Sequence, residues 1–139
     1  MIPASMSVLA TDKPMAGEHL FQKALANVDN ISTIGLQKQL ETQPDTVVID
    51  VRNKDEINQF GGMIESRRTL QIARGWLEHY APQSVTDVDT PIVVYCGTGQ
   101  RSPFAAQTLT AMGYKNVKNY QDGFFKWRDA GLPVKSFDK

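Results

Sequence analysis

The sequence contains a single cysteine, Cys96, so it can form no internal disulfide and its fold does not depend on an oxidising compartment. No apolar run approaches the length of a membrane span, and 15 Lys and Arg residues balance 15 Asp and Glu residues. Because there is no basic surplus, neither nucleic acid nor a membrane is expected as a partner. The sequence has two histidines and no Cys or His pair at zinc-binding spacing, so no metal and no cofactor are expected.

The start of the chain, residues 1–14, lacks the basic and long apolar regions of a signal peptide. We therefore expect a cytoplasmic protein; a periplasmic location would require that a signal peptide had been removed from a longer chain. Residues 1–16 contain two prolines and no clear period, which predicts a flexible tail. The remaining residues, 17–139, have the length of one domain.

Segments of strand type alternate with segments of helix type along this domain. Apolar residues at helical spacing predict an amphipathic N-terminal helix over 18–28 that packs outside the core. Further helices are expected at 34–40, 54–60, 73–80 (ended by Ala81 and Pro82), 102–112 and 124–130. Strands are expected near 31–33, 46–51, 69–72, 92–95 and 114–120. The alternation predicts an α/β fold, with a central, mainly parallel five-stranded sheet covered by helices on both faces.

Cys96 lies between the end of one predicted strand and the start of a helix, where α/β proteins bind ligands. A free cysteine is often an inert, buried hydrophobic residue. Here, however, it is followed by Gly97-Thr98-Gly99 and by the cation of Arg101, and Ser102 can cap the next helix. Glycines let successive N–H groups turn toward one point, which would stabilise a thiolate or an anion bound to it. We call residues 96–101 the Cys loop and expect it to be a nucleophilic site.

Neither histidine, His19 or His79, is near Cys96 in the sequence, so a Cys–His hydrolase has weak support. A thiolate within a ring of N–H donors suits two reactions. One is sulfur transfer through a cysteine persulfide, and the other is phosphoryl transfer through a phosphocysteine.

These segments resemble the rhodanese family of sulfurtransferases in its single-domain form. Asp50-Val51-Arg52 resembles the D-x-R that ends the family's second strand, and Glu56 resembles the acidic residue shortly after it. The Cys loop with Ser102 resembles the family's C-x-x-G-x-R-S. The stretch from Leu109 through Asp122-Gly123-Phe124 to Val134 resembles the family's ending, and the similarity covers about 31–134. Met63 stands where the family usually has histidine.

The resemblance implies a rhodanese-like fold and a thiosulfate sulfurtransferase type of enzyme. Cys96 would take a sulfane sulfur from thiosulfate or a persulfide and pass it to cyanide or a thiol. The loop residues that would surround the outer sulfur are Gly97, Thr98, Gly99, Gln100 and Arg101. Supporting residues would be Asp50, Arg52, Glu56 and Ser102, with Arg101 pairing with Glu56 or Asp50. Candidates for positive charge at the mouth of the loop are Arg67, Arg68 and Arg74.

Two alternatives remain beside this enzyme. In the first alternative, the chain is a sulfur carrier or interaction module that delivers sulfur to a protein partner, and helix 18–28 is a docking or oligomer surface. Less favoured is a phosphatase of the related Cdc25 type, or an arsenate reductase. Phosphatases of that type have five residues between Cys and Arg, whereas Cys96 and Arg101 are separated by four. The shorter ring suits one extra sulfur atom better than a tetrahedral phosphate.

Overall fold

The computed structural model describes residues 13–137. Most of the predicted tail, 1–16, therefore lies outside the described residues. The helices are α2 (Gly17–Ala26), α3 (Thr33–Thr42), α4 (Lys54–Gln59), the 3₁₀ turn η1 (Arg74–Trp76), α5 (Leu77–Ser84), α6 (Ser102–Ala111) and α7 (Gly123–Asp129). The strands are β1 (Asp29–Ile31), β2 (Val47–Asp50), β3 (Met63–Ile64), β4 (Thr69–Gln71), β5 (Ile92–Tyr95), β6 (Val117–Tyr120) and β7 (Val134–Lys135).

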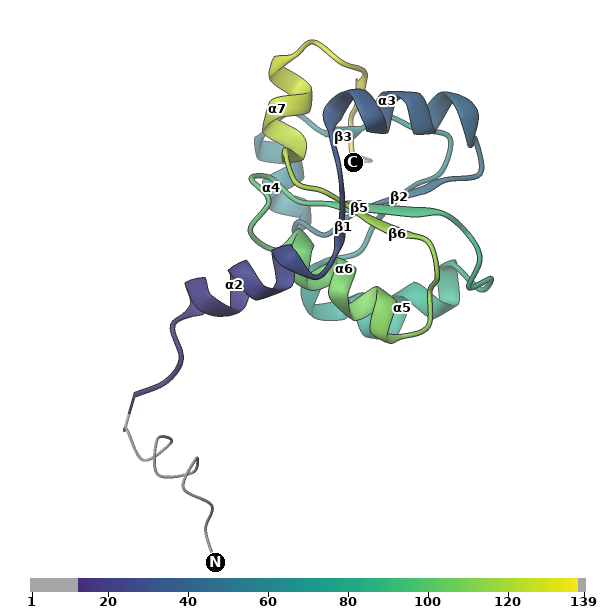
Figure 1. Ribbon diagram of the computed structural model, residues 1–139. Helices are drawn as coiled ribbons and strands as arrows, with labels where there is room; N and C mark the ends of the chain where they lie inside the picture. Colours follow the sequence, from purple (N-terminus) through teal and green to yellow (C-terminus); the bar gives the residue numbers. More distant parts are fainter. Residues whose placement is uncertain (1–12, 138–139) are drawn as a thin grey trace, which may run out of the picture.

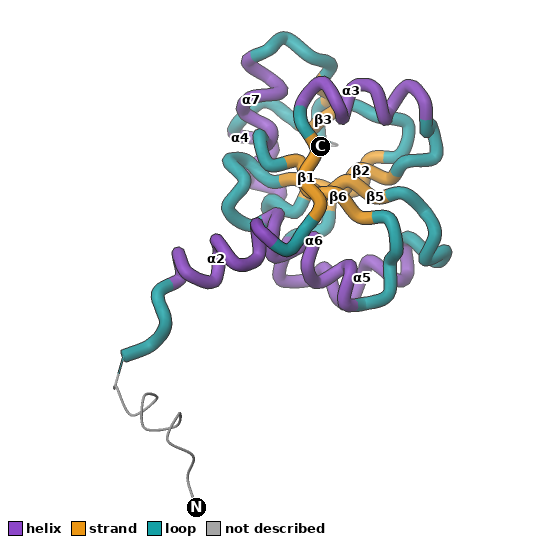
Figure 2. The backbone as a smooth tube through the Cα atoms, viewed as in Figure 1, coloured by secondary structure: helices purple, strands orange, loops and turns teal. Residues whose placement is uncertain are grey.

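Five strands form one parallel sheet in the order β1-β6-β5-β2-β4, which confirms the predicted fold class. Figures 1 and 2 show α3 and α7 on one face of this sheet, and α5 and α6 on the other. The central strands β2 and β5 are buried at every residue, because helices cover both of their faces. Their runs of valine and isoleucine are typical of such strands.

Side chains of the central strands alternate between two hydrophobic clusters. On one face, Val48, Val93 and Tyr95 pack against Leu36 of α3 and Trp127 of α7. On the other face, the cluster holds the apolar residues of α5 and α6 and includes Cys96 itself. The thiol therefore lies at the end of the strand in the middle of the sheet, between helices on both sides.

The N-terminal helix is present as α2 and packs on α6, which agrees with its predicted place outside the sheet. Ala24 is its buried residue, and the rings of Phe21 and Phe104 lie 6.4 Å apart.

Two local predictions were wrong, and one pair of strands was missed. Pro82 does not end the helix before it; α5 continues to Ser84 because Ala81 and Val85 are buried, and their packing holds the last turn. Ser102 does not cap α6, because the helix begins one residue earlier than a Ser102 cap requires and Arg101 occupies the cap position. Finally, β3 and β7 form a short antiparallel pair that the sequence did not indicate.

Candidate active site

The Cys loop begins at the carboxyl end of β5, and all five strands of the sheet are parallel. The segments that follow β2, β4, β5 and β6 therefore meet at one edge of the sheet. Cys96 is buried at this edge, with 1% of its surface exposed. It is free and is the only cysteine of the chain.

Two backbone N–H groups of the loop point at the sulfur. Gly99 N lies 3.2 Å from Cys96 Sγ, and Arg101 N lies 3.4 Å from it. Both donate to sulfur from the far side of the loop, so the chain curls around the thiol. Backbone N–H groups that converge on one point form a concave site of positive partial charge.

The loop keeps this curl because its carbonyl groups are held on the outside. The N–H of Phe124, at the start of α7, donates to Cys96 O at 2.9 Å, and Gln121 Nε2 donates to Gly99 O at 2.9 Å. Gly99 has a φ of +82°, a conformation that side chains disfavour, and a Cβ there would also collide with Gln121. Because the carbonyls are bound outward, the N–H groups are left facing the sulfur.

Gly123→Ala is expected to open this loop. Gly123 has a φ of +80°, which costs alanine about 1–2 kcal/mol, and the new Cβ would overlap the carbonyl oxygen of Gly97. Displacing the loop by a fraction of an ångström should slow the reaction at Cys96 by about tenfold or more. Melting temperature and turnover measure the two effects.

The matched control is Gly131→Ala. Gly131 has a similar φ of +76°, but nothing lies within 4 Å of a Cβ placed there. Both variants should melt at a lower temperature, yet only Gly123→Ala should lose turnover. Equal turnover in the two variants would contradict the role assigned to the contact between α7 and the loop.

Arg101 is bound to Glu56 by two hydrogen bonds. Its Nη1 and Nη2 atoms lie 2.8 and 2.7 Å from the two carboxylate oxygens. The hydrogen bonds from Arg101 lower the pKa of Glu56, and the backbone N–H of Asn53 adds to this effect. The same hydrogen bonds raise the pKa of Arg101. The pair therefore stays ionised at neutral pH and fixes the end of the Cys loop to the start of α4.

Asp50 and Arg52 form a second pair directly beneath the loop, and both side chains are at most 1% exposed. Arg52 Nη2 donates to Asp50 Oδ2 and to Gly62 O, both at 2.7 Å. Burial works to lower the pKa of Arg52, but the hydrogen bond and charge of Asp50 outweigh it, and the pKa is raised. Arg52 also lies 4.3 Å from the ring centroid of Phe124, so the pair supports both the loop and α7.

Tyr95 links this layer to β3, the strand that contains Met63. Its hydroxyl accepts a hydrogen bond from Ile64 N at 2.9 Å. Burial, with the charge of Asp50 in addition, raises the pKa of Tyr95 well above its ordinary value. Tyr95 is therefore a neutral structural group rather than an acid or base for the reaction.

The remaining predicted residues are not all at this edge. Arg67 and Arg68 precede β4, and Arg68 Nη1 donates to Asp45 O, just before β2. In a parallel sheet this is the amino edge, opposite Cys96, so the prediction that these two arginines supply charge at the mouth was wrong. Arg74 follows β4, but its guanidinium donates to Glu78 at 3.1 Å and to Thr108 at 2.9 Å.

Ser102 and the outer loop residues differ in exposure. The hydroxyl of Ser102 is buried and has no hydrogen-bond partner within residues 13–137. Thr98 and Gln100 are the exposed residues of the Cys loop between Cys96 and Arg101. Sequence reasoning did not identify Gln121 and Phe124 as parts of the site, although the Gly-Phe pair after β6 was noted as part of the family's ending.

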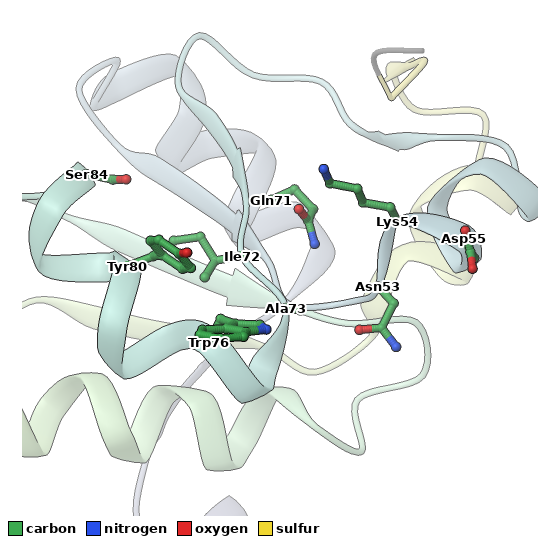
Figure 3. Close-up of a pocket in the computed structure, with 9 residues that line it drawn as sticks. All are labelled: Asn53, Lys54, Asp55, Gln71, Ile72, Ala73, Trp76, Tyr80 and Ser84. Carbon is green, nitrogen blue, oxygen red and sulfur yellow. The ribbon is translucent and has the colours of Figure 1, made fainter.

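Two hollows lie near this edge, and Cys96 lines neither. The larger, of about 670 Å³, lies between the starts of α4 and α5, where Trp76 and Tyr80 are exposed (Figure 3). The smaller, of about 390 Å³, contacts the Cys loop through Thr98 and Gln100. We base the site on the sulfur and its donors rather than on the larger hollow, because the chemistry requires a nucleophile.

Comparisons with known proteins identify the family and the fold. A family model described as "Rhodanese-like domain" matches residues 33–130. A Schizosaccharomyces pombe protein with the provisional name thiosulfate sulfurtransferase, mitochondrial, is 34% identical, over 73% of this chain and 81% of its own length.

Two solved structures share the fold at similar identity. The polysulfide-sulfur transferase homodimer of Wolinella succinogenes is 31% identical, with a TM-score of 0.76 over 87% of this chain and 88% of its own. A Rhodopseudomonas palustris protein of unknown function, described as a possible tyrosine phosphatase, is 28% identical. Its TM-score is 0.78, over 90% of this chain and 98% of its own. No helix within residues 13–137 is both long and apolar enough to cross a membrane.

Proposed function

The chain belongs to the rhodanese-like domain family as a sulfurtransferase, and from this premise we propose that Cys96 carries the transferred sulfur as a persulfide. The observation that supports this most directly is the position of Sγ. It lies at the end of the central strand with two backbone N–H donors directed at it, from Gly99 and Arg101. A buried, free nucleophile with two backbone donors directed at it suits a covalent exchange on sulfur.

The reaction proceeds in two displacements. The Cys96 thiolate attacks the outer sulfur of thiosulfate, the S–S bond of the donor breaks, and sulfite leaves with the electron pair. The terminal sulfur of the new persulfide then carries the negative charge, which the N–H groups of the loop stabilise. Cyanide or a thiolate attacks that sulfur, and the Cys96 thiolate leaves, so no net oxidation of the enzyme occurs.

The donor is thiosulfate or a low-molecular-weight persulfide. Gly97 and Thr98, the two residues after Cys96, are neutral, and the charge of Arg101 is compensated by Glu56. Because the loop has no uncompensated positive charge, it does not require a doubly charged donor such as thiosulfate and can also accept a persulfide. The name of the Wolinella succinogenes relative, a polysulfide-sulfur transferase, favours donors with sulfur–sulfur bonds in general.

A phosphatase is the second candidate, because one structural relative is described as a possible tyrosine phosphatase. Four residues separate Cys96 from Arg101, and only two N–H groups of the loop lie within hydrogen-bond distance of Sγ. Arg101 is also bound to Glu56 through both terminal nitrogens, which leaves it poorly placed to hold a phosphate. These features favour sulfur over phosphate.

The proposal is tested by intact mass. Incubation with thiosulfate should add about 32 Da, one sulfur atom on the nucleophile, and cyanide should then remove it and release thiocyanate. The proposal fails if neither thiosulfate nor glutathione persulfide gives an adduct and no thiocyanate forms. Hydrolysis of p-nitrophenyl phosphate under those conditions would favour the phosphatase instead.

A further inference from the structure

A hollow of about 390 Å³ lies where α2 meets the Cys loop. Its walls come from α2 and from a stretch distant in sequence, the Cys loop with the start of α6: Gly17, Glu18, Phe21, Thr98, Gln100 and Phe104. Thr98 and Gln100 flank Gly99, whose N–H points at Cys96 Sγ. A molecule that brings its sulfur to Cys96 over this part of the loop would therefore place its remaining atoms in the hollow.

The wall from α2 lies outside the domain that the family model matches, residues 33–130. It is nevertheless fixed in place. Ala24 is buried, and the ring of Phe21 packs 6.4 Å from the ring of Phe104 on α6. In Figure 1, α2 projects from the body on the side where β5 connects to α6. The hollow is therefore closed on one side by a segment beyond the matched domain.

The hollow combines apolar rings with one negative charge. Phe21 and Phe104 supply the rings, and Glu18 is the only ionisable residue among the described ones that line the hollow. Gln22 Nε2 donates to Glu18 Oε2 at 2.7 Å, which orients the carboxylate without neutralising it. Among residues 13–137, no lysine or arginine forms an ion pair with Glu18. The nearest loop cation, Arg101, is already paired with Glu56.

We propose that this hollow is a subsite for a protonated amino group on the sulfur-carrying reactant, so that the preferred donor or acceptor is an aminothiol or its persulfide. The carboxylate of Glu18 attracts the ammonium group, and the two rings contact the adjoining carbon chain. The proposal rests on the proposed function for the identity of the reactant, because only a sulfur donor or acceptor needs to reach Cys96.

The test uses Cys96 as the only thiol of the chain. Methanethiosulfonates with aminoethyl, aminohexyl, ethyl and sulfonatoethyl groups are each added, and the rate of labelling is followed by intact mass. In each case the thiolate attacks the sulfenyl sulfur, a disulfide forms, and methanesulfinate leaves with the electron pair. Glu18→Gln is expected to lower the cationic-to-anionic rate ratio by about fivefold at low salt, because one unpaired carboxylate is lost.

Glu41→Gln is the matched control, since it removes the same charge from an exposed position of α3. Gly17→Leu fills the hollow without a change of charge, because nothing lies within 4 Å of a Cβ at that position, and it should slow the aminohexyl reagent. An unchanged ratio in Glu18→Gln, or an equal change in Glu41→Gln, overturns the subsite. Labelling by these reagents does not require sulfur transfer. A missing thiosulfate adduct would therefore overturn the proposed function, whereas the labelling rates would still decide whether the subsite exists.

Discussion

Cys96→Ser should lose sulfur transfer altogether, with a fall in turnover of at least about a thousandfold. Serine has nearly the same shape, and its oxygen can accept the N–H groups of Gly99 and Arg101 that now point at sulfur. A hydroxyl is not ionised at neutral pH, however, and oxygen does not form a persulfide. The variant should therefore fold normally but show neither a mass increase with thiosulfate nor thiocyanate production.

Two measurements make this result decisive. An unchanged melting temperature would show that the loss comes from chemistry rather than from unfolding. Thr110→Ser is a suitable companion variant, because it alters an exposed residue near the end of α6 and should keep persulfide formation at Cys96. Turnover that survives in Cys96→Ser would refute the assignment of the nucleophile.

Asp50→Ala is expected to cause the largest loss of stability. It would leave the guanidinium of Arg52 buried and uncompensated, with only Gly62 O as a hydrogen-bond acceptor for its charged nitrogens. Arg52 Nη1 already has no partner within the described residues, so the site cannot easily absorb the loss. Breaking a buried pair in this way costs about 3–5 kcal/mol, which lowers the melting temperature of a domain of this size by on the order of 10 °C.

Asp89→Ala provides the comparison at the surface. Asp89 lies 3.9 Å from Lys115, and both side chains are more than 70% exposed. Its removal should change stability by less than about 1 kcal/mol. A double variant, Asp50→Leu with Arg52→Met, should be more stable than Asp50→Ala alone, because no unpaired charge remains buried. A double variant as unstable as the single one would show that shape, not charge, explains the effect.

The fold was predictable because the local sequence of its central strands identifies them as strands. The runs of valine and isoleucine at β2 and β5 have no other stable location than a sheet covered on both faces. The Cys loop was equally predictable, since two glycines shortly after a single cysteine allow the backbone to curl around the thiol. The pair β3 and β7 was not predictable, because each strand has two residues and the two lie some seventy positions apart.

The errors at the site have physical explanations as well. Arg67 and Arg68 precede their strand while Cys96 follows its own, so strand direction alone would have placed them on opposite edges. The helix that contains Glu18 and Phe21 was expected, but the helical spacing of its apolar residues does not indicate which other helix it packs against. That choice depends on Phe104, which lies more than eighty residues away and contacts Phe21 only in the folded chain. The hollow beside the loop was therefore invisible in the sequence.

The contact between α7 and the Cys loop also sets an order of events during biosynthesis. The carbonyl of Cys96 is held by Phe124, which the ribosome adds 28 residues after the cysteine. A nascent chain that has just exposed β5 and α6 carries the thiol but lacks the amide that fixes the loop around it. The loop can therefore be held for sulfur chemistry only when the last helix is made, after all five strands of the main sheet have been translated.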